Sequence, residues 1–384
     1  MKAIVNGILL LPDCEVKGQA LLYDHIIRAL VPQDQAAAQA DEILDAQGLY
    51  VSPGLIDVHI HGYGGDDVSD DDPEGIRRMA GSLLPNGVTS FLPTTLTVPW
   101  PRLESVCRHM RALAQESRRA DFPGAQILGV HLEGPFINPA YKGAQNPDCV
   151  LPPDAERVLP WADIVKVITL APEMPGAEEC IRILKQRTPI ALSMGHTGAT
   201  FEQAQAAIGW GVTRATHLFN AMTPLHHRNP GAVGAALNSD IYTELIADTF
   251  HVHPGIFPML AQAKPHRLVL ITDALRAAGM PDGDYEIGGQ RFRLQGIACR
   301  LPDGTIAGSV LKMNQAVKNL KDHGHIPLWQ AVRAASLNAA ASAGLDMCKG
   351  SLTPGKDADI VLMDGDCRVA AAIDRGVCKY QQAL

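Results

Sequence analysis

Short apolar runs rich in β-branched residues alternate with stretches of helical periodicity over most of the chain. Leu55–Ile60 is entered through Pro53-Gly54 and left through Gly62, which predicts a buried strand. Residues 73–86 follow with apolar positions at helical spacing. The same alternation recurs for about 300 residues, and strands alternating with helices favour a parallel sheet.

We count about eight strand–helix units, which predicts an α/β fold with a closed (β/α)8 barrel of the TIM type. A doubly wound open sheet is the alternative. It is disfavoured because no G-x-G-x-x-G motif opens a helix after the first strand. We assign the barrel to residues 53–349, and we read residues 282–308 as a β-rich insertion within it.

Both ends of the chain have a different pattern, with short strands and turns in place of strand–helix units. Residues 1–52 and 350–384 are therefore expected to form one small β-sandwich domain beside the barrel. Asn6-Gly7 lies between two apolar runs and predicts a β-hairpin. Residues 369–377 are expected to form a single strand.

Composition narrows the class of protein. The 384 residues are 46% hydrophobic and 19% charged, with a formal net charge of −8, so a basic surface for nucleic acid is not expected. No apolar run reaches the roughly 18 residues needed to span a bilayer, and no lysine-rich amphipathic helix suggests a membrane surface. The eight cysteines are scattered without a C-x-x-C motif, which is typical of reduced thiols in a cytoplasmic protein.

Polar residues cluster where the predicted strands end. Residues at i and i+2 of a strand share a face, so His59 and His61 should project together. Active sites of barrels lie at the C-terminal strand ends. Imidazole and carboxylate ligands without cysteine suit Zn²⁺, Fe²⁺, Mn²⁺ or Co²⁺, and their number allows one or two ions. The strand-end residues are His59, His61, His131, Glu133, His196, His217, Asp248 and Asp273.

Several motifs carry a resemblance to a known family. The segment from Pro53 to Gly62, PGLIDVHIHG, resembles the first strand of the amidohydrolase superfamily. Narrower motifs over residues 50–355 together resemble the N-acetylglucosamine-6-phosphate deacetylase family within it. These motifs are HLEGPF from His131, KGAQNP from Lys142, GHT from Gly195, THLFNAM from Thr216, RNPG from Arg228, IAD from Ile246, HVHP from His251 and TDA from Thr272.

The resemblance implies a metal centre and a catalytic group. Glu133, His196 and His217 match the metal ligands common to the family. His59 and His61 match a pair that completes a second site in some members, with Glu133 as a bridge. Asp273 matches the catalytic aspartate and completes the expected set of metal ligands. A carboxylate there can accept a proton from water and return it to the leaving nitrogen.

The resemblance also implies how a phosphosugar is held. Asn220, the backbone N–H of Ala221, Arg228 and His251 match phosphate-contacting positions, and the family's arginine reaches the neighbouring subunit, which implies a homodimer. Gln145 stands where the family usually has histidine. Glutamine can donate a hydrogen bond but cannot carry charge, so we expect slower turnover or an altered sugar preference.

Together, these expectations predict an enzyme that uses a metal ion to hydrolyse N-acetylglucosamine 6-phosphate to glucosamine 6-phosphate and acetate. A deacylase for a related phosphosugar, such as N-acetylgalactosamine 6-phosphate, shares every motif and stays open. A cyclic-amide hydrolase or aminohydrolase of the same superfamily is disfavoured by Asn220, Ala221 and Arg228. A catalytically silent sugar-phosphate binder is disfavoured by the intact metal and catalytic positions.

Overall fold

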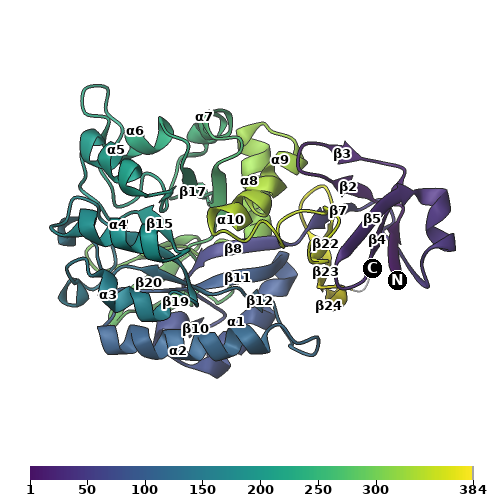
Figure 1. Cartoon of the computed structure of the whole chain (residues 1–384), viewed down its shortest axis with the longest axis horizontal. Coiled ribbons are helices and arrows are strands. Elements are labelled where there is room, and N and C mark those ends of the chain that lie inside the picture. Colours follow the sequence, from purple (N-terminus) through teal and green to yellow (C-terminus); the bar gives the residue numbers. More distant parts are fainter. Residues whose placement is uncertain (383–384) are drawn as a thin grey trace.

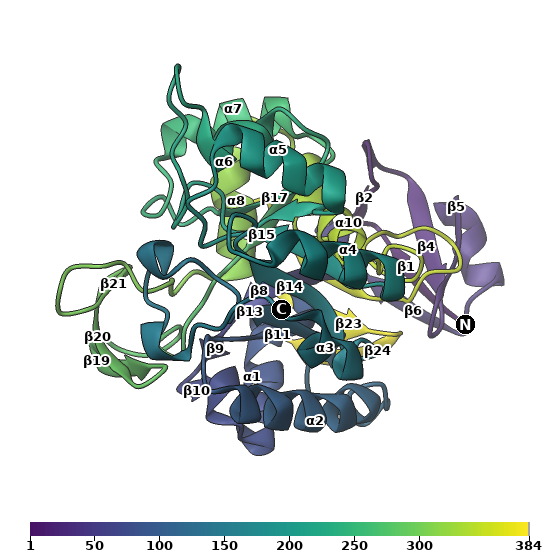
Figure 2. The same ribbon diagram turned by 60° about the vertical axis from the view of Figure 1, so that its left-hand side comes forward.

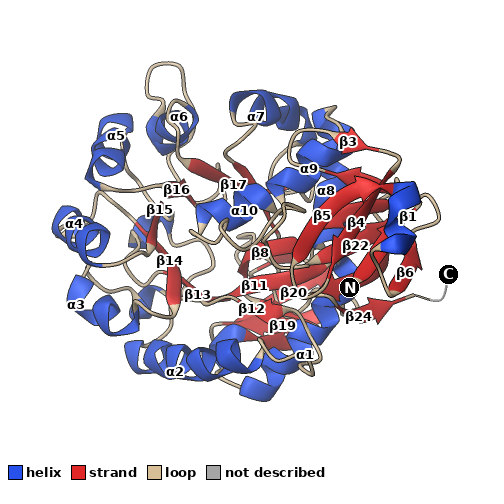
Figure 3. Ribbon diagram, turned by 45° about the vertical axis from the view of Figure 1, so that its right-hand side comes forward, coloured by secondary structure: helices blue, strands red, loops and turns tan. Residues whose placement is uncertain are grey.

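Eight parallel strands form the centre of the protein, whose computed structural model describes residues 1–382. The strands follow one another around the ring in chain order, and the helices surround them (Figure 3). This confirms the predicted (β/α)8 barrel. Its strands are β8 (Leu55–Ile60), β11 (Val88–Thr95), β13 (Val130–Glu133), β14 (Val165–Leu170), β15 (Ala191–Met194), β16 (Arg214–Ala215), β17 (Tyr242–Ile246) and β18 (Leu268–Ile271), with a short β12 (Gln126–Ile127) beside β11.

The seam between the last barrel strand and the first runs through polar residues. The backbone N–H of Asp273 donates to the carbonyl oxygen of His59 at 2.9 Å. Just before it, the Thr272 hydroxyl donates to the Asp57 carboxylate at 2.6 Å. The side chain of Asp57 is fully buried. The first and last strands of the barrel therefore meet where two candidate functional residues, His59 and Asp273, lie side by side.

Amphipathic helices cover the outside of the barrel. Helix α1 shows how the sequence builds one: Asp72 accepts a hydrogen bond from Glu74 N as its N-cap, Pro73 occupies the first turn, and Ile76 and Met79 face the core. The helices are α1 (Pro73–Leu83), α2 (Trp100–Glu116), α3 (Ala155–Val158), α4 (Ala177–Arg187), α5 (Phe201–Trp210), α6 (Gly231–Leu237), α7 (Phe257–Ala263), α8 (Met313–Gly324), α9 (Leu328–Ala334) and α10 (Leu337–Ser342).

Two further sheets lie beside the barrel, at the right of Figure 1. One sheet has the order β24-β23-β22-β7-β2-β3, so it joins strands from both ends of the chain, and the other has the order β5-β4-β1-β6. They share an apolar core that includes Ile4, Leu21, Val51 and Ile360. The strands are β1 (Lys2–Val5), β2 (Ile8–Leu10), β3 (Glu15–Val16), β4 (Gln19–Tyr23), β5 (Ile27–Pro32), β6 (Glu42–Asp45), β7 (Tyr50–Pro53), β22 (Ile360–Met363), β23 (Val369–Asp374) and β24 (Val377–Gln381).

Two local predictions in this region are wrong. The Asn6-Gly7 hairpin does not form, because β1 pairs with β4 and β6 whereas β2 pairs with β3 and β7. The expected single strand over residues 369–377 is a hairpin, in which β23 and β24 pair on either side of Arg375-Gly376. Gly376 is required there, because a Cβ atom at this position would lie 1.8 Å from the carbonyl oxygen of Asp24.

The β-rich insertion is present as an antiparallel sheet of β19 (Gly283–Ile287), β20 (Gln290–Gln295) and β21 (Ala298–Arg300). It projects from the barrel at the left of Figure 2. A short hairpin of β9 (Gly62–Tyr63) and β10 (Asp66–Asp67) follows the first barrel strand. Among residues 1–382, none of the helices has the length and apolar character required to cross a membrane.

Candidate metal centre and active site

Four histidines and two carboxylates converge at the C-terminal ends of the barrel strands. His59 lies in β8 and His61 follows one residue after its end, so the alternation of the strand directs both rings to the same side. Their Nε2 atoms are 3.3 Å apart. Both side chains are buried. The spacing read from the sequence therefore places this pair as expected.

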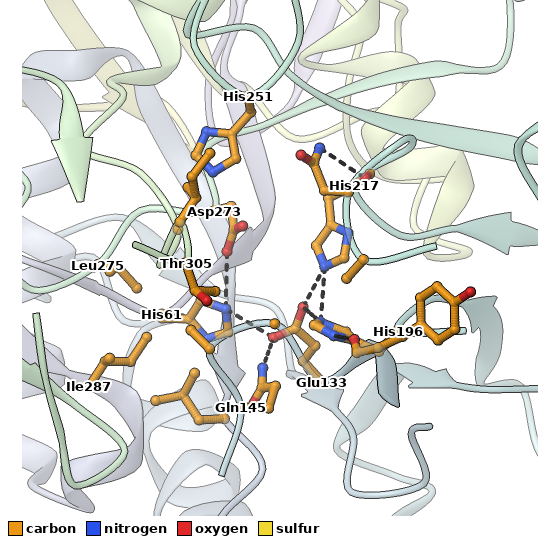
Figure 4. Close-up of a pocket in the computed structure, with 18 of the residues that line it drawn as sticks. His61, Glu133, Gln145, His196, His217, His251, Asp273, Leu275, Ile287 and Thr305 are labelled. Atoms are coloured by element: carbon orange, nitrogen blue, oxygen red, sulfur yellow. Dashed lines mark hydrogen bonds and ion pairs between the residues drawn. The ribbon is translucent and has the colours of Figure 1, made fainter. Parts of the chain in front are cut away.

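Glu133, the last residue of β13, lies between two groups of histidines (Figure 4). Its Oε1 is 3.1 Å from His196 Nε2 and 3.0 Å from His217 Nε2. Its Oε2 is 3.2 Å from His61 Nε2. One carboxylate thus faces both groups, as a bridging ligand must.

Asp273 lies beside the His59 and His61 pair. Its Oδ1 is 3.1 Å from His61 Nε2 and 3.5 Å from His59 Nε2. Asp273, His196 and His217 each follow a barrel strand, and all three have a positive φ, of 51°, 48° and 28°. Such backbone conformations are costly for residues other than glycine and concentrate at functional sites. This unfavourable backbone conformation therefore occurs at three positions whose side chains point to the centre of the site.

Close packing under the site also constrains the sequence. A Cβ atom at Gly195 would lie 2.7 Å from Thr216 Cβ and 2.8 Å from Thr169 Cγ2. Only glycine allows the chain leaving β15 to approach its neighbouring strands this closely. Gly195 therefore sets the position of His196.

Hydrogen bonds behind the rings fix how the histidines are oriented. The Nδ1 atoms of three of them face acceptors, so these atoms carry the proton and the Nε2 lone pairs face the centre. The acceptors are Glu244 Oε2 for His59 at 3.0 Å, Thr94 O for His61 at 3.1 Å and Tyr141 O for His196 at 2.9 Å. The rings are thus held in the tautomer that binds a metal ion.

The residues present fit a divalent metal ion. Potential ligand atoms of His59, His61 and Glu133 lie within 4.8 Å of one another, as do those of Glu133, His196 and His217. Burial by itself would lower the pKa of His61, yet its hydrogen bonds to Asp273 and Glu133 raise that pKa to about 10. The carboxylates therefore stabilise a positive charge at this point, and a bound divalent cation would supply that charge.

A cavity of about 370 Å³ opens onto this cluster. His59 lies behind it and is fully buried, in contact with His61, Glu133 and Asp273. Apolar side chains such as Leu275 and Ile287 line the side away from His196 and His217 (Figure 4). Nine of the candidate residues line the cavity: His61, Glu133, Gln145, His196, His217, Asn220, Ala221, His251 and Asp273.

Gln145 is held in place by two hydrogen bonds. Its amide nitrogen donates to Glu133 Oε2, and its Oε1 accepts from the backbone N–H of Thr97 at 2.6 Å. The side chain is 4% exposed. Gln145 therefore orients the Glu133 carboxylate and uses one amide hydrogen to do so.

The segment from His217 to Ala221 forms another part of the cavity lining. His217, Phe219 and Ala221 all have positive φ, so this segment turns repeatedly beside the cavity. Alternating backbone conformations of this kind can direct N–H groups to one point and bind anions. Asp248 Oδ2 lies 2.7 Å from His251 Nδ1, which leaves the other ring nitrogen of His251 for the cavity.

Arg228 lies apart from the cavity of its own chain. It belongs to an exposed loop, and its Nη1 is 2.9 Å from the ring of His227. His131, a further strand-end candidate, is also outside the cavity. Its ring is fully buried and contacts Val58 O at 3.1 Å and Thr169 Oγ1 at 2.8 Å. His131 therefore supports the strands beneath the site.

Sequence reasoning missed three charged residues that lie beneath the site. Asp57 joins β8 to Thr272, and burial raises its pKa to about 7. Arg214 and Glu244 form an ion pair inside the barrel, where Arg214 and His59 hold the pKa of Glu244 well below its usual range despite the opposing effect of burial. Asp57 is recognisable in the sequence as a charge inside an apolar strand, whereas the contact between Arg214 and Glu244 depends on the register between β16 and β17.

Comparisons with known proteins agree with this geometry. Residues 50–381 match the model of the amidohydrolase family. An N-acetylglucosamine-6-phosphate deacetylase from Bacillus subtilis (strain 168) is 41% identical over 330 residues, which cover 84% of this chain and 83% of the relative. An N-acetylgalactosamine-6-phosphate deacetylase from Escherichia coli O157:H7 is 38% identical over 362 residues, 91% and 92% of the two chains.

A solved structure shares the whole architecture. It is a mutant N-acetyl-D-glucosamine-6-phosphate deacetylase from Mycobacterium smegmatis in complex with N-acetyl-D-glucosamine-6-phosphate. The two chains are 32% identical with a TM-score of 0.89, and the match covers 99% of each. The barrel and the additional sheets are therefore common to both proteins.

Proposed function

Because this chain belongs to the amidohydrolase family, among its N-acetylglucosamine-6-phosphate deacetylases, we propose that its cavity hydrolyses the acetamide of N-acetylglucosamine 6-phosphate. The products are glucosamine 6-phosphate and acetate. The observation that carries this proposal is the position of Asp273, whose carboxylate lies 3.1 Å from the His61 ring at the floor of the cavity. A proton-transferring group thus stands beside a cluster of metal ligands.

The residues divide the chemistry between them. His59, His61, Glu133, His196 and His217 would hold the metal ion, with Asp273 beside them. A divalent ion held there would supply Lewis-acid chemistry, lowering the pKa of water and polarising the substrate carbonyl. The Asp273 carboxylate accepts the proton of the attacking water and then delivers it to the leaving nitrogen. Burial of these groups excludes bulk water, which strengthens each electrostatic interaction.

Zn²⁺ or Fe²⁺ is the proposed metal, with Mn²⁺ and Co²⁺ as weaker alternatives, because all the ligands are imidazoles and carboxylates. One or two ions per subunit are compatible with the ligand set. Two groups of three ligands share Glu133, which supports two positions. Metal analysis of the isolated protein distinguishes one ion from two.

The phosphate is proposed to occupy the wall opposite the apolar side chains. Asn220, Ala221 and His251 all line the cavity, and the backbone N–H of Ala221 is proposed as one of the phosphate donors. Arg228 would complete this wall in the neighbouring subunit of a homodimer, since it is exposed and is not among the residues that line the cavity of its own chain. A guanidinium group binds phosphate through paired hydrogen bonds. A cytoplasmic location is proposed because all eight cysteines are unpaired.

Acetate release from purified, metal-analysed protein tests the activity. We expect rapid release from N-acetylglucosamine 6-phosphate and slower release from its galacto epimer. Release from the galacto compound alone would instead indicate an N-acetylgalactosamine-6-phosphate deacetylase, the activity named for the Escherichia coli relative. No release from either compound at full metal occupancy would contradict the proposed deacetylation.

Mixing two variants with impaired activity tests the shared site. Arg228→Ala weakens phosphate binding and Asp273→Asn removes the proton carrier. In a mixed dimer, the Arg228→Ala chain supplies Asp273 and its neighbour supplies Arg228, so one site is complete. We expect activity to return on mixing after dissociation and reassembly. A mixture no more active than its parents would show that Arg228 does not act across subunits.

A further inference from the structure

A buried ion pair lies directly beneath the metal centre. Arg214 of β16 and Glu244 of β17 are both fully buried. The Arg214 guanidinium donates through Nη2 to Glu244 Oε1, and through Nη1 to Ser342 at 3.0 Å (O) and 2.7 Å (Oγ). Burying two charges is costly, and such a pair is often no more stabilising than apolar residues of the same volume. Its presence therefore calls for another explanation.

The second oxygen of Glu244 connects this pair to the metal ligands. Glu244 Oε2 accepts a hydrogen bond from His59 Nδ1 at 3.0 Å. The same oxygen accepts the backbone N–H of His217 at 3.1 Å. His217 has a φ of 28°. Glu244 thus contacts one residue from each group of ligands, while Arg214 engages its remaining oxygen.

His59 differs from the other histidines of the centre in this contact. His61 and His196 direct Nδ1 to the neutral backbone carbonyl groups of Thr94 and Tyr141. Within residues 1–382, Nδ1 of His217 has no hydrogen-bond partner. A carboxylate behind a ligating imidazole fixes its tautomer and increases the basicity of the opposite nitrogen. The arrangement therefore favours His59 as the strongest histidine donor.

We propose that Arg214 and Glu244 are positioning residues that make the His59 and His61 half of the centre a metal position of its own. Glu244 strengthens and orients His59, and Arg214 holds Glu244 in place from the opposite side. This inference rests on the proposed metal dependence of the enzyme. It accounts for a buried charge pair that the hydrolytic reaction itself does not use.

Metal binding without substrate tests the inference. Wild-type protein and variants are equilibrated with buffered free Zn²⁺ over a range of concentrations, and bound metal per subunit is measured by mass spectrometry. We expect two ions in wild type. In Glu244→Gln, we expect one ion to bind about 10- to 100-fold more weakly while the other is unchanged. The control Asp359→Asn alters a buried carboxylate paired with Lys349 elsewhere, and both ions should bind as in wild type.

A double variant covers the case in which Glu244→Gln leaves Arg214 unpaired and prevents folding. Arg214→Met with Glu244→Gln removes both charges together, and the amide oxygen can still accept from His59 and His217. We expect the same selective weakening of one ion, because the negative charge behind His59 is gone. The visible spectrum of the Co²⁺-substituted double variant should lose the contribution of one of two ions.

Unchanged affinity for two ions in a folded Glu244 variant would overturn the inference. Equal weakening of both ions in the double variant would also overturn it, because the pair would then act only as general support. The two proposals fail separately. Selective loss of one ion in the Glu244 variants, together with no deacetylase activity in wild type, would contradict the proposed function alone. An active wild-type enzyme whose Glu244 variants bind metal as wild type does would contradict the inference alone.

Discussion

The barrel and the small β domain both bury carboxylates, and they neutralise them differently. The β-domain carboxylate of Asp359 lies 2.6 Å from Lys349, at the boundary with the barrel, and that of Asp374 lies 2.6 Å from Lys379. In the barrel, Glu133 and Asp273 instead contact the imidazoles of the strand-end histidines. Ammonium groups stay charged at neutral pH, whereas imidazoles are neutral when they bind a metal.

This difference separates a structural charge cluster from a functional one. In the β-domain network, each of these two carboxylates has a lysine ammonium group beside it. The barrel cluster keeps a deficit of positive charge and opens onto a cavity, which leaves room for a cation and a substrate. Arg214 and Glu244 resemble the β-domain pairs in having a permanent cation, although they lie beneath the metal centre.

Replacing Asp273 should produce the largest effect on the functional cluster. Asp273→Asn keeps the shape of the side chain and removes its ability to accept a proton. We expect kcat for deacetylation to fall about 1,000-fold. Acetate release gives the rate, and metal content measured on the same sample shows whether ion binding has changed. A fall of less than about tenfold at full metal occupancy would remove Asp273 from the proposed role.

Replacing Lys349 should break the structural cluster and leave the functional one intact. Lys349 is 2% exposed, and Lys349→Met leaves Asp359 buried without its nearest cation. We expect the free energy of unfolding to fall by about 3 kcal/mol, with metal content unchanged. Urea denaturation measures the loss, and adding Asp359→Asn should recover part of it. Lost metal binding in the folded variant would show that the two clusters are not independent.

The pH dependence of stability sharpens the contrast within the β domain. Burial, and then the nearby Asp359 charge, raise the pKa of Asp374 to about 6 from an ordinary value of 3.8. A carboxyl group with a raised pKa stabilises the fold below its unfolded pKa and loses that contribution as pH rises through its folded pKa. Between pH 4 and 7, wild type should therefore lose about 1–3 kcal/mol that Asp374→Asn does not lose.

Urea denaturation at several pH values measures that difference. The control is Asp45→Asn, which alters an exposed carboxylate on β6 of the same domain. Its stability should follow wild type across the range. Parallel curves for Asp374→Asn and wild type would show that Asp374 does not titrate in this way.

The smallest expected effect concerns Gln145. Histidine in its place could donate to Glu133 and also carry a charge, which glutamine cannot. We expect Gln145→His to raise kcat about fivefold, the difference between a neutral and a charge-assisted hydrogen bond of about 1 kcal/mol. Rates on both epimers of the substrate check it. Unchanged rates and unchanged epimer preference would show that Gln145 is a neutral variation.

The barrel and most residues of the metal centre could be predicted because their signals are periodic. A strand–helix alternation identifies parallel strands, and a polar residue where a strand ends lies at the mouth of the barrel. The chain from His59 to Asp273 contains six such residues in the observed cluster. Strand geometry alone was sufficient to direct His59 and His61 to the same side.

The remaining features depend on which strands become neighbours. Asn6-Gly7 is a local hairpin signal, but distant partners pair with β1 and β2 and place them in different sheets. Arg214 and Glu244 are charges inside short strands, where a charge usually indicates a solvent-facing position. Their contact depends on the register of the neighbouring strands β16 and β17, in which Arg214 pairs with Tyr242 and Ala215 with Thr243. The periodicity of the sequence identifies the strands but does not give the register between them.

The imidazole and carboxylate cluster is proposed to work through a bound cation. The most direct test removes metal with a chelator, dialyses the chelator away and adds Zn²⁺ back in steps, while acetate release and bound metal are measured on each sample. We predict no release from metal-free protein and a return of activity in proportion to the bound ion. Undiminished release from protein holding less than about a tenth of an ion per subunit would contradict the account.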